Sequence, residues 1–574
     1  MIRTFAEHRI RQTRELGGQW DFITDPGNIG GQEQWYKQFP VPQTNVFVPA
    51  CWNNEFGLYD YEGVAWYRTT FELAQPEHLR LIFHAVLGHA DVYLDGTHLG
   101  YHYGGYSPFE FIVSRAAAGT HELIVRTDST LTRQTIPIDL VDWFHYGGII
   151  RPVELQYLPD IFIDKLRVDY TLNDARSHAD VNVTVRLRSL GDADRSVPLN
   201  LQADGQVFHQ ETLTVPAGQT VTAEVRQTWT DVRLWQPGQA ELYLIGAVTD
   251  TDDRYDRIGF RHIEVKERRI CINGEPLYLQ GVNRHEEHPE WGFAFPPKLM
   301  KKDLDLIKEL GCNTVRGSHY PQSPYWIDLL DEHGIVYWSE IPMWGAHMPK
   351  EVTTDALFRQ RAMQMIDEMI ERDIHHPSIV FWSVHNEIDT TCQEAVDLTL
   401  PMVELVRGKD SSRLVTYATM HPLKDVLLPL FDVIGINKYH GWYEGKVEGF
   451  QEMLKQFHAY AESVGAGDKP ILMTEFGAAG IYGDTGWEPR LFSEDYQAHV
   501  LTEALRIFRS DPKIGGTYIW QFADVRADLQ SQRNSFRDRA RSFNNKGLLN
   551  EYRKPKQAYR VVRDIYKSGA PEKG

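Results

Sequence analysis

Two glutamates stand at the ends of short apolar runs and are the residues of this chain best suited to chemistry. Glu387 follows the run Ile379–Asn386, and Glu475 follows the run Ile471–Thr474. Both runs have the composition of buried strands, where an unpaired charge costs several kcal/mol. Two carboxyl groups that face one site are the minimal equipment for cleaving a glycosidic bond. The pair therefore indicates a glycoside hydrolase.

A retaining glycosidase divides the work between a nucleophile and an acid/base whose carboxyl groups lie about 5 Å apart. The nucleophile must stay ionised, whereas the acid needs a raised pKa. We expect the cations Arg316 and His319 to keep Glu475 ionised, and the amide of Asn386 to hydrogen-bond the 2-hydroxyl of the sugar. The spacing alone does not say which glutamate plays which role.

The elements that would position these residues alternate between apolar runs and amphipathic helical stretches from residue 265 onward. The helical stretches include 298–310, 323–333, 357–375 and 494–509. The eight apolar runs lie at 278–282, 314–316, 336–339, 379–384, 414–417, 433–436, 471–474 and 516–520. This alternation predicts a C-terminal (β/α)8 TIM barrel over residues 265–574, with the reaction at the carboxyl ends of its strands. The fourth and seventh strands lie nearly opposite each other in such a ring, so their glutamates would face each other across its mouth.

The first half of the chain has a different texture. Residues 1–160 are dense in short β-like runs broken by Gly, Pro, Asn and Asp, which predicts an all-β sandwich. Residues 161–264 show clean alternation of apolar and polar positions, as in Asp180–Leu187, over a length that suits an immunoglobulin-like β-sandwich. The sequence therefore predicts a multidomain protein with two sandwiches before the barrel.

Composition excludes several classes of partner. The 574 residues carry a formal net charge of −19, which argues against nucleic acid and anionic membranes. The sequence contains no apolar stretch of about 18 residues or more, so it predicts no transmembrane helix. The N-terminus lacks an apolar signal core, so we expect a cytoplasmic protein. The cysteines are far apart, without metal-like spacing, and are expected to be reduced thiols: Cys51, Cys271, Cys312 and Cys392.

Four motifs give the chain a recognisable resemblance. They are Gly281–Glu286, Val315–Pro321, His376–Glu387 and Thr474–Gly477. The chain resembles glycoside hydrolase family 2 over essentially its whole length. The resemblance implies a jelly-roll sandwich, an immunoglobulin-like sandwich and a catalytic barrel, in that order. It also implies that Glu387 is the acid/base, that Glu475 is the nucleophile of a retaining mechanism, and that the protein is a homodimer or homotetramer.

Within the family, the segment Asn544-Asn545-Lys546-Gly547 resembles the Asn-x-Lys triplet with which β-glucuronidases grip the sugar carboxylate. An ammonium and an amide can give charge-assisted hydrogen bonds to a uronate, and a local lysine would oppose the negative field of the whole chain. By the same resemblance, further residues that bind the sugar are Asp142, Tyr439, Tyr443 and Trp520. The expected activity is exo-hydrolysis of terminal β-D-glucuronides, carried by small molecules or by uronic-acid-terminated oligosaccharides.

Some positions depart from the patterns of the family. In β-galactosidases the glutamate after the third strand holds magnesium together with a histidine two residues later. Here Glu340 is followed by Ile341 and Pro342, which offer no ligand, so we expect no metal and no cofactor. Arg284 and His385 differ from typical glucuronidases, and a cation or imidazole near the sugar could change the preference at its C4 hydroxyl.

Three alternatives stay open beside the glucuronidase. A β-galacturonidase, or a dual hexuronidase, would use the same carboxylate clamp. A β-galactosidase or β-mannosidase predicts a magnesium pair and no cationic clamp, and the residues show the opposite pattern. A carbohydrate-binding protein on a decayed barrel would have lost one of the two catalytic carboxylates, yet both are present.

Overall fold

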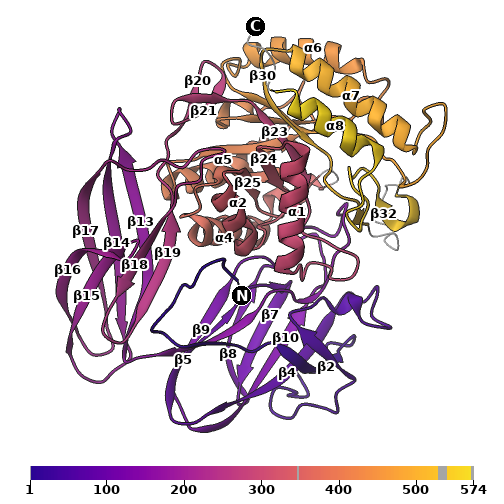
Figure 1. Ribbon diagram of the computed structural model, residues 1–574. Coiled ribbons are helices and arrows are strands. Elements are labelled where there is room, and N and C mark those ends of the chain that lie inside the picture. The colour runs from indigo at the N-terminus through magenta and orange to yellow at the C-terminus, as the bar shows by residue number, and fades with distance from the viewer. Residues whose placement is uncertain (1, 346–347, 528–538, 570–574) are drawn as a thin grey trace.

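The computed structural model describes residues 2–345, 348–527 and 539–569 and shows two β-sandwiches beside a barrel (Figure 1). The first sandwich lies below the barrel and the second lies beside it, and the N-terminus lies where these parts meet. The described residues end after α8 (Gln557–Lys567), on the side of the barrel away from the first sandwich. The expected order of two sandwiches followed by a barrel is confirmed.

The first sandwich contains a six-stranded and a four-stranded antiparallel sheet. In sheet order, the six strands are β3 (Thr44–Val48), β2 (Gly18–Thr24), β4 (Val64–Leu73), β10 (Gly119–Asp128), β7 (His89–Leu94) and β8 (Thr97–Tyr103). The four strands are β1 (Thr13–Glu15), β12 (Val153–Leu158), β5 (Glu77–Phe83) and β9 (Phe109–Ala116), and a short pair is formed by β6 (Val86–Leu87) and β11 (Gly148–Ile149). Their apolar side chains form one core, which includes Trp20, Trp52 and Tyr67.

The second sandwich pairs a three-stranded with a four-stranded antiparallel sheet. The strands are β13 (Ile161–Leu172), β14 (His178–Ser189) and β17 (Thr220–Thr230) in one sheet, and β16 (Gln206–Val215), β15 (Arg195–Ala203), β18 (Tyr243–Val248) and β19 (Asp253–Ile258) in the other. Residues of β14 alternate between buried and more exposed positions, as the sequence pattern predicts. A small sheet then leads into the barrel: β20 (Ile263–Lys266), β21 (Arg269–Ile272) and β22 (Glu275–Leu277).

Eight parallel strands close the barrel. They are β23 (Leu279–Arg284), β24 (Thr314–Gly317), β25 (Val336–Glu340), β26 (Ile379–Asn386), β27 (Leu414–Thr419), β28 (Ile434–Asn437), β29 (Ile471–Glu475) and β30 (Ile514–Ile519). Every residue of β26 and of β29 is buried, because helices cover one face of each strand and the barrel interior the other. All eight strands were predicted within a few residues, since such strands appear in a sequence as continuous apolar runs.

Helices cover the outside of the barrel (Figure 1). They are α1 (Pro297–Leu310), α2 (Pro324–His333), α3 (Lys350–Thr354), α4 (Ala356–Asp373), α5 (Gln393–Lys409), α6 (Gly449–Ser463), α7 (Glu494–Ser510) and α8 (Gln557–Lys567). Local signals mark their ends: the side chain of Ser493 accepts a hydrogen bond at the start of α7, and Gly311, with φ 89°, ends α1.

One connection differs from the expected alternation. Between β27 and β28 the chain forms only the short 3-10 helix η2 (Leu428–Leu430) instead of a full helix. Pro422 and Pro429 lie in this connection, and each proline lacks the N–H that a helix interior needs. The fifth crossover of the barrel is therefore a compact loop.

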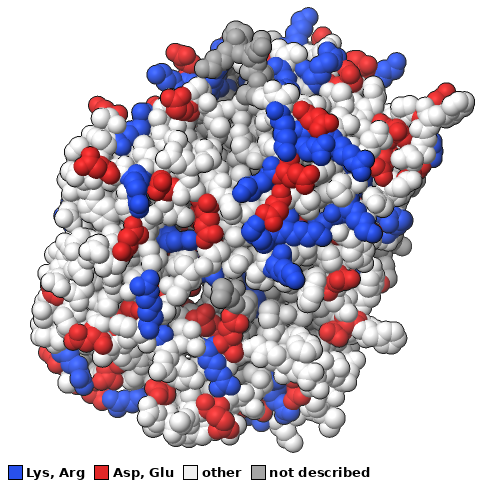
Figure 2. Space-filling model, in the orientation of Figure 1, with Lys and Arg blue, Asp and Glu red and all other residues white. Residues whose placement is uncertain are grey.

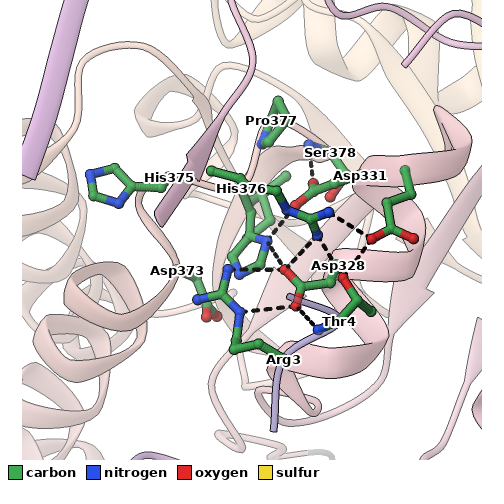
Figure 3. A network of polar contacts seen from close by, with 12 residues as sticks. Arg3, Thr4, Asp328, Asp331, Asp373, His375, His376, Pro377 and Ser378 are labelled. Atoms are coloured by element: carbon green, nitrogen blue, oxygen red, sulfur yellow. Dashed lines mark hydrogen bonds and ion pairs between the residues drawn. The ribbon is translucent and has the colours of Figure 1, made fainter. Parts of the chain in front are cut away.

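A buried ion-pair network joins the N-terminal segment to the barrel (Figure 3). The guanidinium of Arg3 donates two hydrogen bonds of 2.9 Å to Asp328 in α2, and the backbone N–H of Thr4 donates a third to the same carboxylate. Asp328, Asp331 and His376 bring metal-ligand atoms within 4.8 Å of one another. The positive charge beside Asp328 is supplied by Arg3 and by Arg257 of β19, whose guanidinium lies 3.2 Å from the same carboxylate. We therefore interpret the group as an interdomain anchor.

Replacing Arg3 with alanine should destabilise the protein, because the buried carboxylate of Asp328 would lose both hydrogen bonds from Arg3 and keep only Arg257 as a close arginine. We expect the free energy of unfolding to fall by about 3 kcal/mol, the usual cost of breaking a buried pair. Urea denaturation of Arg3→Ala beside Arg14→Ala, an exposed arginine on β1, checks this. Equal stability of the two variants would contradict the anchoring role.

Charges of both signs are spread over the face shown in Figure 2, with basic side chains gathered over the region of α1 and α8. The net charge of −19 therefore does not produce a uniformly negative surface. Among the described residues, none of the helices has the length and apolar character needed to cross a bilayer.

Candidate active site

The two glutamates lie at the carboxyl ends of β26 and β29. Glu475 is the last residue of β29 and is 3% exposed, and Glu387 directly follows β26 and is 9% exposed. The backbone of Glu387 has φ 56°, in the left-handed region that residues with a Cβ seldom adopt. Such conformations cluster at functional sites, where the surrounding fold holds them in place.

Arg316, at the end of β24, connects the strand ends. Its guanidinium donates to Glu475 at 2.7 Å and to the side-chain oxygen of Asn386 at 2.7 Å. The hydroxyl of Tyr439 donates to the other oxygen of Glu475 at 2.8 Å. Glu475 therefore accepts a charge-assisted hydrogen bond from the guanidinium of Arg316 and a second hydrogen bond from the phenol of Tyr439.

Glu340, at the end of β25, holds Arg316 and His319 in place. Both oxygens of its carboxylate accept from Arg316, and His319 Nδ1 lies 2.6 Å from one of them. Burial alone would raise the pKa of Glu340, but the charge of Arg316 and the hydrogen bond with His319 lower it to about 2. His319 Nε2 lies 3.9 Å from Glu475, so Arg316 is the principal cation at that carboxylate.

Glu387 has a different environment. One of its oxygens accepts a hydrogen bond of 2.9 Å from the side-chain amide of Asn437 at the end of β28. Burial, followed by the negative charge of Glu475, raises the pKa of Glu387 to about 8. The two carboxyl groups therefore interact electrostatically, and the raised pKa keeps Glu387 protonated at neutral pH, as an acid catalyst requires.

Asn386 lies between these groups with an unused donor. Its side-chain oxygen accepts from Arg316 and from Asn437, at 2.7 and 3.1 Å. Its side-chain nitrogen is buried and has no hydrogen-bond partner among the described residues. A bound hydroxyl would satisfy this donor, in line with the expected contact to a sugar.

Aromatic rings line the same end of the barrel. The ring of Trp520, directly after β30, stacks on His319 with centroids 5.1 Å apart. His285 contacts Trp520 edge-on and also packs against Trp143 from the first sandwich. Tyr439 and Tyr443 pack against each other at 5.2 Å. Rings and imidazoles thus surround the glutamates with surfaces suited to a sugar.

A second group of charged side chains links the first sandwich to the segment after β30. The ammonium of Lys546 donates to the hydroxyl of Tyr443 at 2.8 Å, and Arg539 donates to the same hydroxyl at 3.2 Å. Arg539 also forms a two-pronged ion pair with Asp142, and the amide of Asn544 donates to Asp142 at 3.2 Å. Lys546 is 1% exposed and Arg539 is 4% exposed, so two cations are buried together here.

The structure brings together the expected catalytic and sugar-binding residues, apart from Arg284 and His385, and adds two that the sequence did not single out. Arg539 belongs to no motif and reaches Asp142 across 397 positions of the chain, so no local signal marks it. His285 lies in the polar stretch after the first barrel strand. This stretch indicates a site at the strand end but does not indicate which of its side chains faces the site. Its Nε2 is buried without a partner among the described residues, and burial lowers its pKa well below the usual value, so it is a neutral imidazole.

Arg284 and His385 do not lie near the sugar site, contrary to the expectation for the C4 preference. Arg284 pairs with Asp303 of α1 at 3.0 Å, and His385 lies 3.1 Å from the hydroxyl of Thr399 in α5. Successive side chains of a strand point to opposite faces, so both residues face the helices while their neighbours face the barrel interior. Neither residue can set the preference for one sugar by contact.

Comparisons with known proteins agree with this architecture. The family model "Glycosyl hydrolases family 2, TIM barrel domain" matches residues 263–569, the sugar binding domain of that family matches 13–159, and a third family 2 model matches 161–261. A β-glucuronidase of Paenibacillus borealis is 29% identical over 601 aligned residues, which cover 96% of each chain.

Two solved structures are similar over nearly the whole chain. The β-galacturonidase of Eisenbergiella tayi bound to galacturonate is 32% identical with a TM-score of 0.90, covering 100% of both chains. The β-glucuronidase of Ruminococcus gnavus in complex with D-glucaro 1,5-lactone is 25% identical with a TM-score of 0.85, covering 99% of both chains. The family model of the barrel alone spans more than half of the sequence. The chain belongs to glycosyl hydrolases family 2 and is a glycoside hydrolase.

Proposed function

We propose that this protein is a retaining, exo-acting β-glucuronidase that removes terminal β-D-glucuronic acid from small molecules or oligosaccharides. The observation that carries the proposal is the buried cationic group of Lys546 and Arg539, which share the hydroxyl of Tyr443. Ammonium and guanidinium groups in a buried site suit the carboxylate of a uronic acid, with which both can form charge-assisted hydrogen bonds. The homo-oligomeric state remains a prediction.

The two glutamates support a double-displacement mechanism. Glu387, protonated because of its raised pKa, gives its proton to the glycosidic oxygen while Glu475 attacks the anomeric carbon. The bond to the aglycone breaks and a covalent glycosyl-enzyme forms. Glu387, now ionised, takes a proton from water, whose oxygen attacks the anomeric carbon and displaces Glu475. The sugar leaves with its original β configuration.

The same charged group supports the proposal of exo action. Asp142, Arg539 and Lys546 are buried or nearly so, and Asp142 reaches the site from the first sandwich. The carboxylate of a terminal uronic acid would complement the cations Lys546 and Arg539, whereas a continuing glycan chain would have to pass between the charged side chains and desolvate them. We therefore propose that one terminal sugar fills this part of the site.

A β-galacturonidase is the second candidate. The favouring observation is the 32% identity to the galacturonidase of Eisenbergiella tayi, against 25% for the glucuronidase of Ruminococcus gnavus. Glucuronide and galacturonide carry the same carboxylate and differ only in the orientation of the C4 hydroxyl. The residues that would grip the carboxylate therefore serve either sugar.

The deciding experiment compares the purified protein on p-nitrophenyl β-D-glucuronide, β-D-galacturonide and β-D-galactoside. We expect kcat/KM to be highest for the glucuronide and lowest for the galactoside, and proton NMR to show the β-anomer as the first product. A preference for the galacturonide would establish the second candidate. A preference for the galactoside, or an α-anomer as first product, would overturn the proposal.

The raised pKa of Glu387 predicts the alkaline limit of activity. As the acid, Glu387 must be protonated, which holds below its pKa of about 8 and is lost as the pH rises through that value. We expect kcat/KM for a phenyl glucuronide, whose leaving group needs a proton, to fall above pH 8. For a 2,4-dinitrophenyl glucuronide, whose leaving group needs no proton, the fall in kcat/KM should be weaker. In Glu387→Gln the fall in kcat/KM at high pH should be absent. The same alkaline limit for both substrates would contradict the acid role.

A further inference from the structure

A buried ion pair lies directly behind the segment that carries Lys546. The ammonium of Lys556 donates to Asp524 at 2.7 Å, and the two residues are 1% and 0% exposed. A buried pair of this kind is often no more stabilising than well-packed apolar residues of the same volume. Its contacts with the rest of the chain therefore indicate what it does.

The pair holds the two peptide groups on either side of Lys546. Lys556 donates a second hydrogen bond, of 3.0 Å, to the backbone carbonyl of Asn545, which belongs to the peptide bond before Lys546. Asp524 accepts a hydrogen bond of 2.9 Å from the backbone N–H of Gly547, which belongs to the peptide bond after it. The Cα of Lys546 is thus fixed from both sides by one ion pair.

The remaining contacts leave this segment little freedom. The side chain of Gln497 donates to the carbonyls of Lys546 and Gly547, and the backbone N–H of Gln521 donates to the carbonyl of Lys546 at 3.0 Å. A Cβ on Gly547 would lie 2.2 Å from the backbone nitrogen of Asp524, so the segment packs closely against the residues that hold it. A loss of the ion pair would therefore be transmitted to the position of Lys546.

We propose that Asp524 and Lys556 are positioning residues that set the location of the Lys546 ammonium and thereby the preference for sugars that carry a carboxylate. The inference rests on the proposed function, because it assumes that Lys546 binds the carboxylate of the sugar. Lysine has a flexible four-carbon stem and makes a point-charge contact, so its affinity for a carboxylate depends on where its backbone is held. Neither positioning residue needs to touch the substrate.

The test uses two inhibitors that differ only in the carboxylate: uronic isofagomine and isofagomine, whose corresponding group is a hydroxymethyl. The variant is Asp524→Asn/Lys556→Met, which removes both charges together and leaves no unpaired ion. We expect its affinity for uronic isofagomine to fall about tenfold and that for isofagomine to change by less than about twofold, since only the carboxylate contact is misplaced. Isothermal titration calorimetry measures both.

A matched control comes from the other end of the barrel. Asp410 and Arg413 form a buried ion pair of 2.7 Å just before β27 and are far from the strand ends that carry the glutamates. Asp410→Asn/Arg413→Met should change stability but leave the ratio of the two affinities as it is in the unmodified protein. If the main variant does not fold, Lys556→Gln, which is too short to keep both of its hydrogen bonds, gives the same comparison.

The outcomes separate this inference from the proposed function. In the background of Lys546→Ala, the double variant should cause no further selective loss, because the contact that it positions is already gone. Equal losses for both inhibitors, or an unchanged ratio while Lys546→Ala loses the carboxylate preference, would overturn the positioning role alone. If the unmodified protein shows no preference for uronic isofagomine, the proposed function itself fails.

Discussion

Replacing Glu475 with alanine is expected to reduce turnover of a β-glucuronide to less than about one per cent of the original, because the covalent intermediate can no longer form. The fold should persist, since Arg316 keeps its bonds to Glu340 and Asn386. Steady-state kinetics and circular dichroism of the purified variant test both expectations. Residual activity above this level, after contamination by the unmodified enzyme is excluded, would contradict the nucleophile assignment.

Azide, used as an external nucleophile, distinguishes the roles of the two glutamates. In Glu475→Ala, azide can enter the space of the missing carboxylate and attack from its side, which should give an α-glycosyl azide. In Glu387→Ala, the glycosyl-enzyme still forms from an activated substrate, and azide should then displace Glu475 to give a β-glycosyl azide. NMR of the two products distinguishes the roles. If the anomers are reversed, the roles of acid/base and nucleophile are reversed too.

Replacing Lys546 with alanine should cost the most among the residues that bind the sugar. We expect kcat/KM for a β-glucuronide to fall roughly 100- to 1,000-fold, equivalent to about 3–4 kcal/mol, because a buried carboxylate loses its countercharge. The same variant should hydrolyse p-nitrophenyl β-D-glucoside, which has no carboxylate, at nearly the original rate.

Lys554→Ala is the matched control, because Lys554 is an exposed lysine eight positions further along the chain. It should leave both substrates unaffected. If Lys546→Ala slows the glucuronide and the glucoside equally, the lysine has a structural role rather than a role in recognition. If it slows neither, the Asn-x-Lys interpretation is wrong and the neutral-sugar alternative takes its place.

Periodicity predicts the barrel well because each of its strands is buried on both faces, as in β26 and β29. The same strands also locate the glutamates, since a carboxylate after a buried run has few structural uses. The missing helix before β28 was not anticipated, although Pro422 and Pro429 were visible in the sequence. The regular alternation of strands and helices predicts a helix here, whereas the two prolines disfavour one.

Contacts between distant segments are what the sequence could not predict. Arg539 and Asp142 meet only because the first sandwich packs against the segment after β30, and neither residue carries a pattern that identifies the other. Arg284 and His385 were misplaced for a different reason. The alternation of side chains along a strand, applied to the neighbours Asn283 and Asn386, would have turned both residues away from the site.

The anchor of Arg3 has a consequence for synthesis on the ribosome. Asp328 is made 325 positions after Arg3. At roughly 5 to 20 residues per second, that interval lasts about 15 to 65 s. During this time the segment around Arg3 has no partner in the barrel. Arg3 can pair with Asp328 only when α2, which contains Asp328, has been made. Arg3 therefore reaches its native place only after both sandwiches have been made.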